Sequence, residues 1–207
     1  MLSAIEAETA KRAESYAAAP VYNRFPGAEP GTPVDSPARI HLDWNPGSPV
    51  SARALVLAAE NRLERISDAI LVCSPPQIRR EAPLDLNFTD IEILFNDHVK
   101  GWFFLIKELA AAFKAKGEGT LSLVYPEVNE SPGEEEAPGL LGHSALAVFR
   151  TLTRDLLASA FSEPFITLGF TGVEEPGFAA FIFKQLEEKT RRANGKLYKY
   201  GKLSFFK

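Results

Sequence analysis

From residue 39 onward, short apolar stretches alternate with long segments of helical spacing. Residues 68–74 and 120–126 are mostly apolar over the length of a strand, which is typical of strands buried on both faces of a parallel sheet. The full set comprises expected strands at 39–44, 68–74, 120–126, 165–172 and 196–206 and expected helices at 51–66, 89–117, 144–161 and 176–192. Strands that alternate with long helices predict an α/β fold in which helices cover a mostly parallel sheet of about five strands.

The first 38 residues follow a different pattern. Residues 3–18 are rich in Ala, Glu and Lys and predict a helix, whereas 21–39 contains four prolines and two glycines and predicts an irregular arm. We therefore expect 1–38 to form a helix and an arm, and 39–207 to form one domain. The acidic, Pro- and Gly-containing stretch 129–139 predicts a surface loop.

Composition excludes several classes of function. A formal net charge of −4 argues against nucleic acid as the main partner, because phosphate backbones are bound by clustered Lys and Arg. The single cysteine, Cys73, and three histidines far apart in sequence predict neither an internal disulfide nor a metal site. The chain contains no apolar stretch of membrane-spanning length and does not begin like a signal peptide. We therefore expect a cytoplasmic protein that makes no contact with membranes.

Four segments resemble, in the correct order, parts of the short-chain dehydrogenase/reductase (SDR) family. "DAILVCSPP" is similar to the strand that ends in Asn-Asn-Ala-Gly, and "DHVKGWFF" is similar to the start of the helix with the pattern Asn-x-x-Gly-x-Phe. "ALAVFRTLTRDLLASAFSEPFITLGFTG" resembles the segment that follows the Tyr-x3-Lys motif, up to the Pro-Gly that ends the next strand. "NGKLYKYGK" resembles the last strand and its Gly-Gly turn. The resemblance implies a Rossmann-like three-layer sandwich.

The resemblance does not extend to the catalytic residues of the family. His98 stands at the position of the asparagine, Tyr125 or Pro126 at that of the serine, Gly142 at that of the tyrosine and Leu146 at that of the lysine. Glycine cannot transfer a proton and leucine cannot lower a neighbouring pKa, so the acid–base step of the family has no agent here. His98, Tyr125 and His143 are the remaining candidates for acid–base chemistry.

The Gly-rich turn of a dinucleotide site is also missing from the sequence. Gly27 and Gly31 have the spacing Gly-x3-Gly, but prolines follow where a helix should begin. Only 16 residues separate Gly27 from Asp43, whereas a βαβ unit needs about 30. We therefore predict that no NAD(P) is bound and that the first βαβ portion is missing or replaced. The strand 39–44 is then expected to lie beside 68–74.

Two helices predict assembly with a second chain. In the resembled family, the helices that match 89–115 and 144–161 pack against the same helices of another subunit. Residues 89–113 are more apolar than one buried stripe requires, which predicts an interface unless the helix 3–18 covers it. The leading hypothesis is a non-catalytic module that forms a homodimer, or a heterodimer with an SDR relative. One alternative is an NAD(P)-dependent oxidoreductase with a non-standard or shared site, and another is a cleft that binds an apolar small molecule without reaction.

Overall fold

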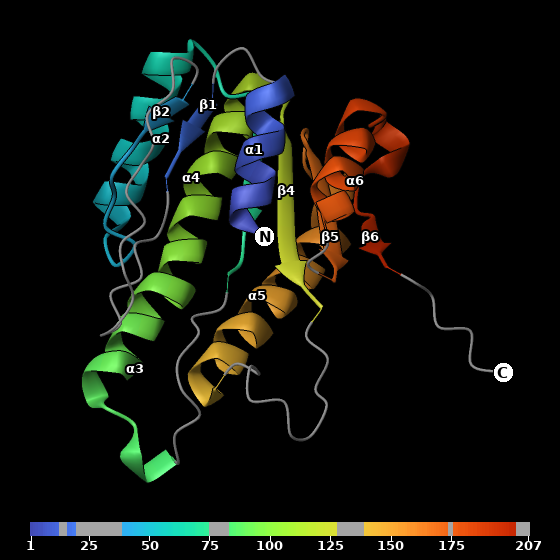
Figure 1. Ribbon diagram of the computed structural model, residues 1–207. Coiled ribbons are helices and arrows are strands. Elements are labelled where there is room, and N and C mark those ends of the chain that lie inside the picture. The colour runs from blue at the N-terminus through green and yellow to red at the C-terminus, as the bar shows by residue number, and fades with distance from the viewer. Residues whose placement is uncertain (13–15, 20–38, 75–82, 128–138, 174–175, 202–207) are drawn as a thin grey trace, which may run out of the picture.

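The computed structural model describes residues 1–12, 16–19, 39–74, 83–127, 139–173 and 176–201. A parallel sheet of four strands in the order β3–β4–β5–β6 lies at the centre of this part of the chain (Figure 1). The strands are β3 (Asp68–Val72), β4 (Thr120–Pro126), β5 (Ile166–Gly172) and β6 (Leu197–Tyr200). The predicted α/β, Rossmann-like fold is confirmed, but the described residues place four strands in this sheet instead of about five.

Helices cover both faces of the sheet and form the predicted three layers. On one face lie α2 (Pro49–Leu63), α4 (Gly101–Lys116) and α5 (Leu140–Ser159), which pack on Leu121, Leu123 and Tyr125 of β4. On the other face α1 (Leu2–Arg12) and α6 (Pro176–Glu187) pack around Val124 of β4 and Phe170 of β5. Successive residues of β4 point to opposite faces, and those from Thr120 to Tyr125 are all buried, which explains the mostly apolar pattern of this strand.

A second, separate sheet replaces the expected first strand of the fold. It consists of β1 (Tyr16–Ala18) and β2 (Arg39–His41), which pair in parallel. Two predictions are therefore wrong: residues 16–18 were expected to be helical, and 39–44 was expected to lie beside 68–74. The high helix propensity of alanine is overridden at Ala17 and Ala18 by pairing with β2, because propensity differences are small beside tertiary contacts. The division of the chain at residue 38 stays a prediction, since residues 20–38 lie outside the described part.

The long helix predicted at 89–117 is interrupted. It consists of α3 (Phe88–Leu94), a π-helical turn labelled η2 (Phe95–Lys100), and α4. Asn87 caps the helix in place of Thr89, since its side chain accepts the backbone N–H of Thr89 at 2.9 Å. Gly117 ends the helix as predicted, in a left-handed conformation with a φ of 75°. One π-helical turn leaves the spacing of the apolar residues in the helix almost unchanged, so it could not be predicted from the sequence.

The remaining elements differ from expectation mainly at their ends. The helix predicted at 51–66 begins at Pro49 behind the N-cap Ser48, and the helix predicted at 144–161 begins at Leu140. The shorter elements are η1 (Pro83–Asp85), η3 (Ala160–Ser162) and η4 (Arg191–Ala193), and α6 and β6 end before the predicted 192 and 206. Gly27, Gly31 and nearly all of the acidic loop 129–139 lie outside the described residues. Within the described ranges, no helix is long and apolar enough to cross a bilayer.

Candidate functional site

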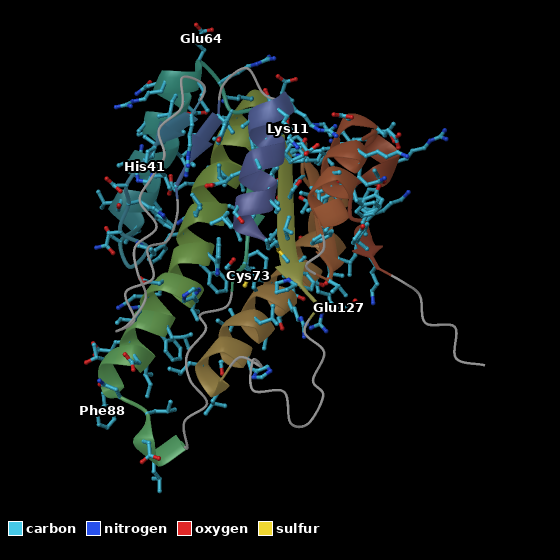
Figure 2. All side chains as sticks on the ribbon, viewed as in Figure 1. Lys11, His41, Glu64, Cys73, Phe88 and Glu127 are labelled. Carbon is cyan, nitrogen blue, oxygen red and sulfur yellow. The ribbon has the colours of Figure 1, made fainter. Side chains whose placement is uncertain are left out.

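The carboxyl ends of β3, β4 and β5 meet at one edge of the sheet, where ligands bind in open α/β folds. Figure 2 shows Cys73, which follows β3, and Glu127, which follows β4, at this same end. The helix α5 lies over the end of β4, since the guanidinium of Arg150 donates to the carbonyl of Pro126 at 3.4 Å. This edge is therefore the place to test for the chemistry of the resembled family.

Tyr125 is held at this edge by aromatic and cationic neighbours. Its ring centroid lies 6.4 Å from that of Phe149 in an edge-on arrangement, and the Arg150 guanidinium lies 5.7 Å from the Tyr125 ring centroid. Burial raises the pKa of the Tyr125 hydroxyl, and the positive charge of Arg150 opposes this rise only in part. The hydroxyl thus stays protonated at neutral pH and is a poor proton acceptor.

His98 lies on the π-helical turn η2 and is 9% exposed. Burial lowers the pKa of His98 to about 4, so the imidazole is neutral at physiological pH. Its Nδ1 atom is buried and makes no hydrogen bond within the described part of the chain. His98 is therefore a buried neutral side chain beside a cavity and carries no charge that could polarise a substrate.

His143 does not join the other two candidates. It lies half-buried in the first turn of α5, where its backbone N–H donates to the carbonyl of Gly139 at 3.0 Å. Among the residues that the structure describes, no hydrogen bond, ion pair or ring contact connects His98, Tyr125 and His143. These three side chains do not form a catalytic group in this conformation.

The other positions aligned with the family's catalytic residues carry no ionisable side chain. Leu146 is 1% exposed and packs in the core with Phe149, and Gly142 is also buried. Pro126 ends β4. The core contacts of Leu146 explain why this position holds an apolar residue: an ammonium group there would lose its hydration without gaining a partner.

Cys73, considered in the sequence only as evidence against disulfides and metal sites, lies directly after β3 and is fully buried. Its backbone N–H donates to the carbonyl of Val124 at 2.8 Å, which holds the residue against β4. Burial raises the pKa of the Cys73 thiol to about 12, with a smaller opposing effect from Arg150. Because the thiolate is the reactive form of cysteine, this thiol is inert in the folded protein.

We expect the native protein to react with a thiol reagent at least about 100-fold more slowly than the protein unfolded in guanidinium chloride. Absorbance of the released thiolate measures the rate, and Cys73 is the only cysteine of the chain. The control is Cys73→Ala combined with Ala54→Cys on the exposed face of α2, which should react rapidly in the native state. Equal rates for native and unfolded Cys73 would show that β3 is open to solvent.

A cavity of about 690 Å³ lies beside this edge and is the feature that sequence reasoning missed. It separates β1 from β3, and α1 borders it on one side while α2 and α4 border it on the other. Ser74, His98 and Trp44 line it near the carboxyl end of β3. Its walls are otherwise mainly apolar. Nothing in the local sequence signals this space, because it depends on two strands that do not meet.

The described residues do not fit a dinucleotide in this cavity. Pyrophosphate binds at the carboxyl ends of the strands, where a helix begins. The cationic residues of the cavity wall, Arg12, Arg65 and Lys189, lie instead toward the amino end of β3. Two of them are paired with carboxylates, Lys189 with Asp68 and Arg12 with Glu187. Within the described residues, no cluster of His, Cys, Asp and Glu is suited to a metal ion.

Comparison with known proteins finds similarity in structure only. No protein-family model and no curated protein sequence matches the chain. The protein Sniffer of Caenorhabditis elegans is similar over 95% of this chain and 90% of its own, with a TM-score of 0.67 and 13% identity. Acetoin dehydrogenase YohF of Salmonella typhimurium is similar over 78% of this chain and 73% of its own, with a TM-score of 0.62 and 14% identity.

A third similar structure is a 3-ketoacyl-(acyl-carrier-protein) reductase of Brucella melitensis in complex with NADH. The similarity covers 79% of this chain and 77% of the reductase, with a TM-score of 0.61 and 11% identity. At such identities the comparisons establish the fold and leave the activity open. The resemblance drawn from the sequence is thus confirmed at the level of the fold.

Proposed function

We propose that this chain, which has the fold of the short-chain dehydrogenases/reductases, is a non-catalytic module that assembles with a second copy of itself. The absence of catalysis is inferred from the residues at the family's active positions. Gly142 and Leu146 carry no proton to exchange, and Tyr125 has a raised pKa where a catalytic tyrosine needs a lowered one. An acid–base step would therefore require groups other than these.

Three exposed phenylalanines on one helical segment support self-association. Phe88, Phe95 and Phe103 are 86%, 53% and 52% exposed, and they follow one another along α3, η2 and α4. We call these three residues the aromatic stripe, and Figure 2 shows Phe88 at the end of the molecule where α3 begins. Large apolar side chains exposed along one helical segment of a soluble protein are candidates for an interaction surface. The first helix does not cover the stripe, because α1 packs on α6 across the sheet.

The outward face of α5 offers a complementary surface. The inner sides of α4 and α5 meet at Trp102 and Phe149, whose ring centroids are 4.8 Å apart, so both helices belong to the same outer layer. Ala147, Thr151 and Ala158 are exposed on α5 and have small side chains. In a twofold dimer the aromatic stripe of each copy can pack on the small residues of the other, since such an interface is self-complementary. This favours a second copy as the partner.

We expect the combined substitution Phe95→Glu/Phe103→Glu to weaken self-association at least about 100-fold, because charged groups would be buried in an apolar interface. Sedimentation velocity over a range of concentrations gives the dissociation constant, and circular dichroism checks that the variant is folded. The control is Leu57→Glu on α2, which replaces an equally exposed leucine (48%) away from the stripe. A parent protein that is monomeric at every concentration contradicts the homodimer. Native mass spectrometry then shows whether an SDR relative takes the place of the second copy.

The titles of the similar structures favour a second candidate, an NAD(P)-dependent oxidoreductase with an unusual or shared site. Two of them name a dehydrogenase and an NADH complex of a reductase. The fluorescence of NADH and NADPH distinguishes the two candidates, because the proposed non-catalytic module should leave it unchanged. Enhanced cofactor fluorescence, or turnover that His98→Gln or Tyr125→Phe abolishes, would establish the oxidoreductase in its place.

A further inference from the structure

The strand β3 has one unpaired edge. Its backbone groups at residues 67 and 73 bond to β4, since Thr120 N–H donates to Ser67 O at 3.0 Å and Cys73 N–H donates to Val124 O at 2.8 Å. In a parallel ladder, alternate residues of a strand bond to the same neighbour. The N–H and C=O groups of Asp68, Ile70 and Val72 therefore point away from β4, and within the described residues no strand accepts them.

The strand β1 has an unpaired edge of the same kind. Leu42 N–H donates to Ala18 O at 3.0 Å, so Ala18 faces β2. By the same alternation, the backbone groups of Ala17 and Ala19 point to the opposite side. Among the described residues, β2 is the sole strand that pairs with β1.

Both unpaired edges border the same cavity of about 690 Å³. Every residue from 16 to 19 and every residue from 65 to 72 lines it, as expected where a cavity runs along the edges of two strands. Its two other walls are mainly apolar: Leu55, Val56 and Leu105 belong to one helical layer, and Ile5, Phe183 and Leu186 belong to the other. Glu6, Arg12 and Glu187 add charged groups to the second wall. We call this space, between the edges of β1 and β3 and the two helical layers, the strand slot.

We propose that the strand slot binds an extended peptide segment of another polypeptide, which adds a strand between β1 and β3. An extended backbone carries N–H and C=O groups on two edges and side chains on two faces. The slot presents the matching surfaces, polar groups on two edges and apolar side chains on two faces. An aliphatic ligand would bury the edges without hydrogen bonds, and a dinucleotide would place charge against the apolar walls.

The slot also defines the chemistry of the peptide. β3 is five residues long, so the added strand has about five residues and spans about 17 Å. Both of its faces meet mainly apolar side chains, which favours successive apolar and β-branched residues as in a strand buried on both faces. Proline is excluded at the paired positions because it lacks the N–H group. This site is independent of the aromatic stripe, and the proposal does not rest on dimerisation.

Amide hydrogen exchange measured by NMR tests the proposal within a single strand. The probe is the acetylated and amidated peptide Lys-Val-Ile-Val-Val-Lys, whose lysines keep it soluble. In the free protein the amides of Leu71 and Cys73, which face β4, are expected to exchange slowly, and those of Ile70 and Val72 are expected to exchange faster. Saturating peptide is expected to slow the exchange of Ile70 and Val72 at least about tenfold, while Leu71 and Cys73 change little and serve as the control.

A second peptide separates backbone recognition from apolar contact. N-methylation of alternate residues removes the donors on one edge and keeps the apolar surface, so this peptide should bind at least about 10-fold more weakly. Equal binding of the two peptides would overturn the proposal in favour of a slot that recognises apolar surface alone. Ile70 and Val72 amides that are already as protected as Leu71 in the free protein would overturn it too, because the chain would then fill the slot itself. If saturating peptide does not slow the exchange of Ile70 and Val72, the proposal is also contradicted.

Discussion

Gly119→Ala should lower the free energy of unfolding by about 4 kcal/mol, the largest effect that we expect from one substitution. Gly119 has a φ of 139°, a conformation that residues with a side chain rarely adopt. A Cβ atom at this position would lie 2.2 Å from Cδ1 of Phe113. Phe113 is fully buried and its ring centroid lies 5.7 Å from that of Phe165, so it has no space into which to move.

The backbone at Gly119 cannot shift freely either. Its carbonyl accepts the N–H of Ile166 at 2.9 Å, which ties the turn after α4 to the start of β5. Strain in φ and overpacking against Phe113 therefore add, at about 1–3 kcal/mol each. Denaturant unfolding followed by circular dichroism measures the loss.

The neighbouring Gly117 provides a matched control two residues away. It also has a positive φ, 75°, but a Cβ atom there would have no neighbour within 4 Å. Gly117→Ala should therefore cost only the conformational strain, about 1 kcal/mol. If the two substitutions prove equally destabilising, the contact with Phe113 does not determine the conformation of this turn.

Acidification should destabilise the protein through His98 by about 3 kcal/mol between neutral pH and pH 4. Burial lowers the pKa of His98 from 6.5 to about 4 in the folded state, whereas the unfolded chain takes up the proton near 6.5. The unfolded state therefore binds more protons between these two values. The contribution of His98 to stability is complete above pH 6.5, falls as the pH decreases through this window, and changes no further below about 4.

Carboxylates also titrate at low pH, so the effect of His98 on stability is obtained from the difference between two proteins. The free energy of unfolding is measured against pH for the parent protein and for His98→Gln, which has no titratable group at this position. We expect the difference between the two curves to change by about 3 kcal/mol across the window. His143→Gln is the control and should follow the parent, because His98 remains in it. Parallel curves for the parent and His98→Gln would mean that His98 is protonated without cost and thus solvated.

The central strands and the main helices could be predicted from the sequence because their cause is local. Residues 120–126 form β4 as expected, since a strand buried on both faces is mostly apolar. The pairing of β1 with β2 could not be predicted, because three-residue strands carry too little pattern to specify a partner. The π-helical turn at 95–100 could not be predicted either. One wider turn displaces the apolar positions of the helix too little to change the spacing seen in the sequence.

Some properties of the candidate site could likewise be predicted from the sequence, and others depend on the fold. That Gly142 and Leu146 lack ionisable groups is a property of residue identity and needs no coordinates. The neutral state of His98, the raised pKa of Tyr125 and the inert thiol of Cys73 depend on burial, which is set by residues distant along the chain. Burial decides these properties because the energy of a charge depends on the surrounding dielectric more than on its neighbours in sequence.

By itself, then, the sequence determined an α/β chain with a parallel sheet between two helical layers. It also determined that Gly142 and Leu146, at the positions of the family's tyrosine and lysine, cannot exchange protons. Both follow from residue type and spacing. The tertiary structure alone decided where the sheet stops: β3 and β1 do not meet, and a cavity lies between their edges. Strand pairing is a long-range contact between backbone groups that every residue type except proline shares, so side-chain patterns do not record it.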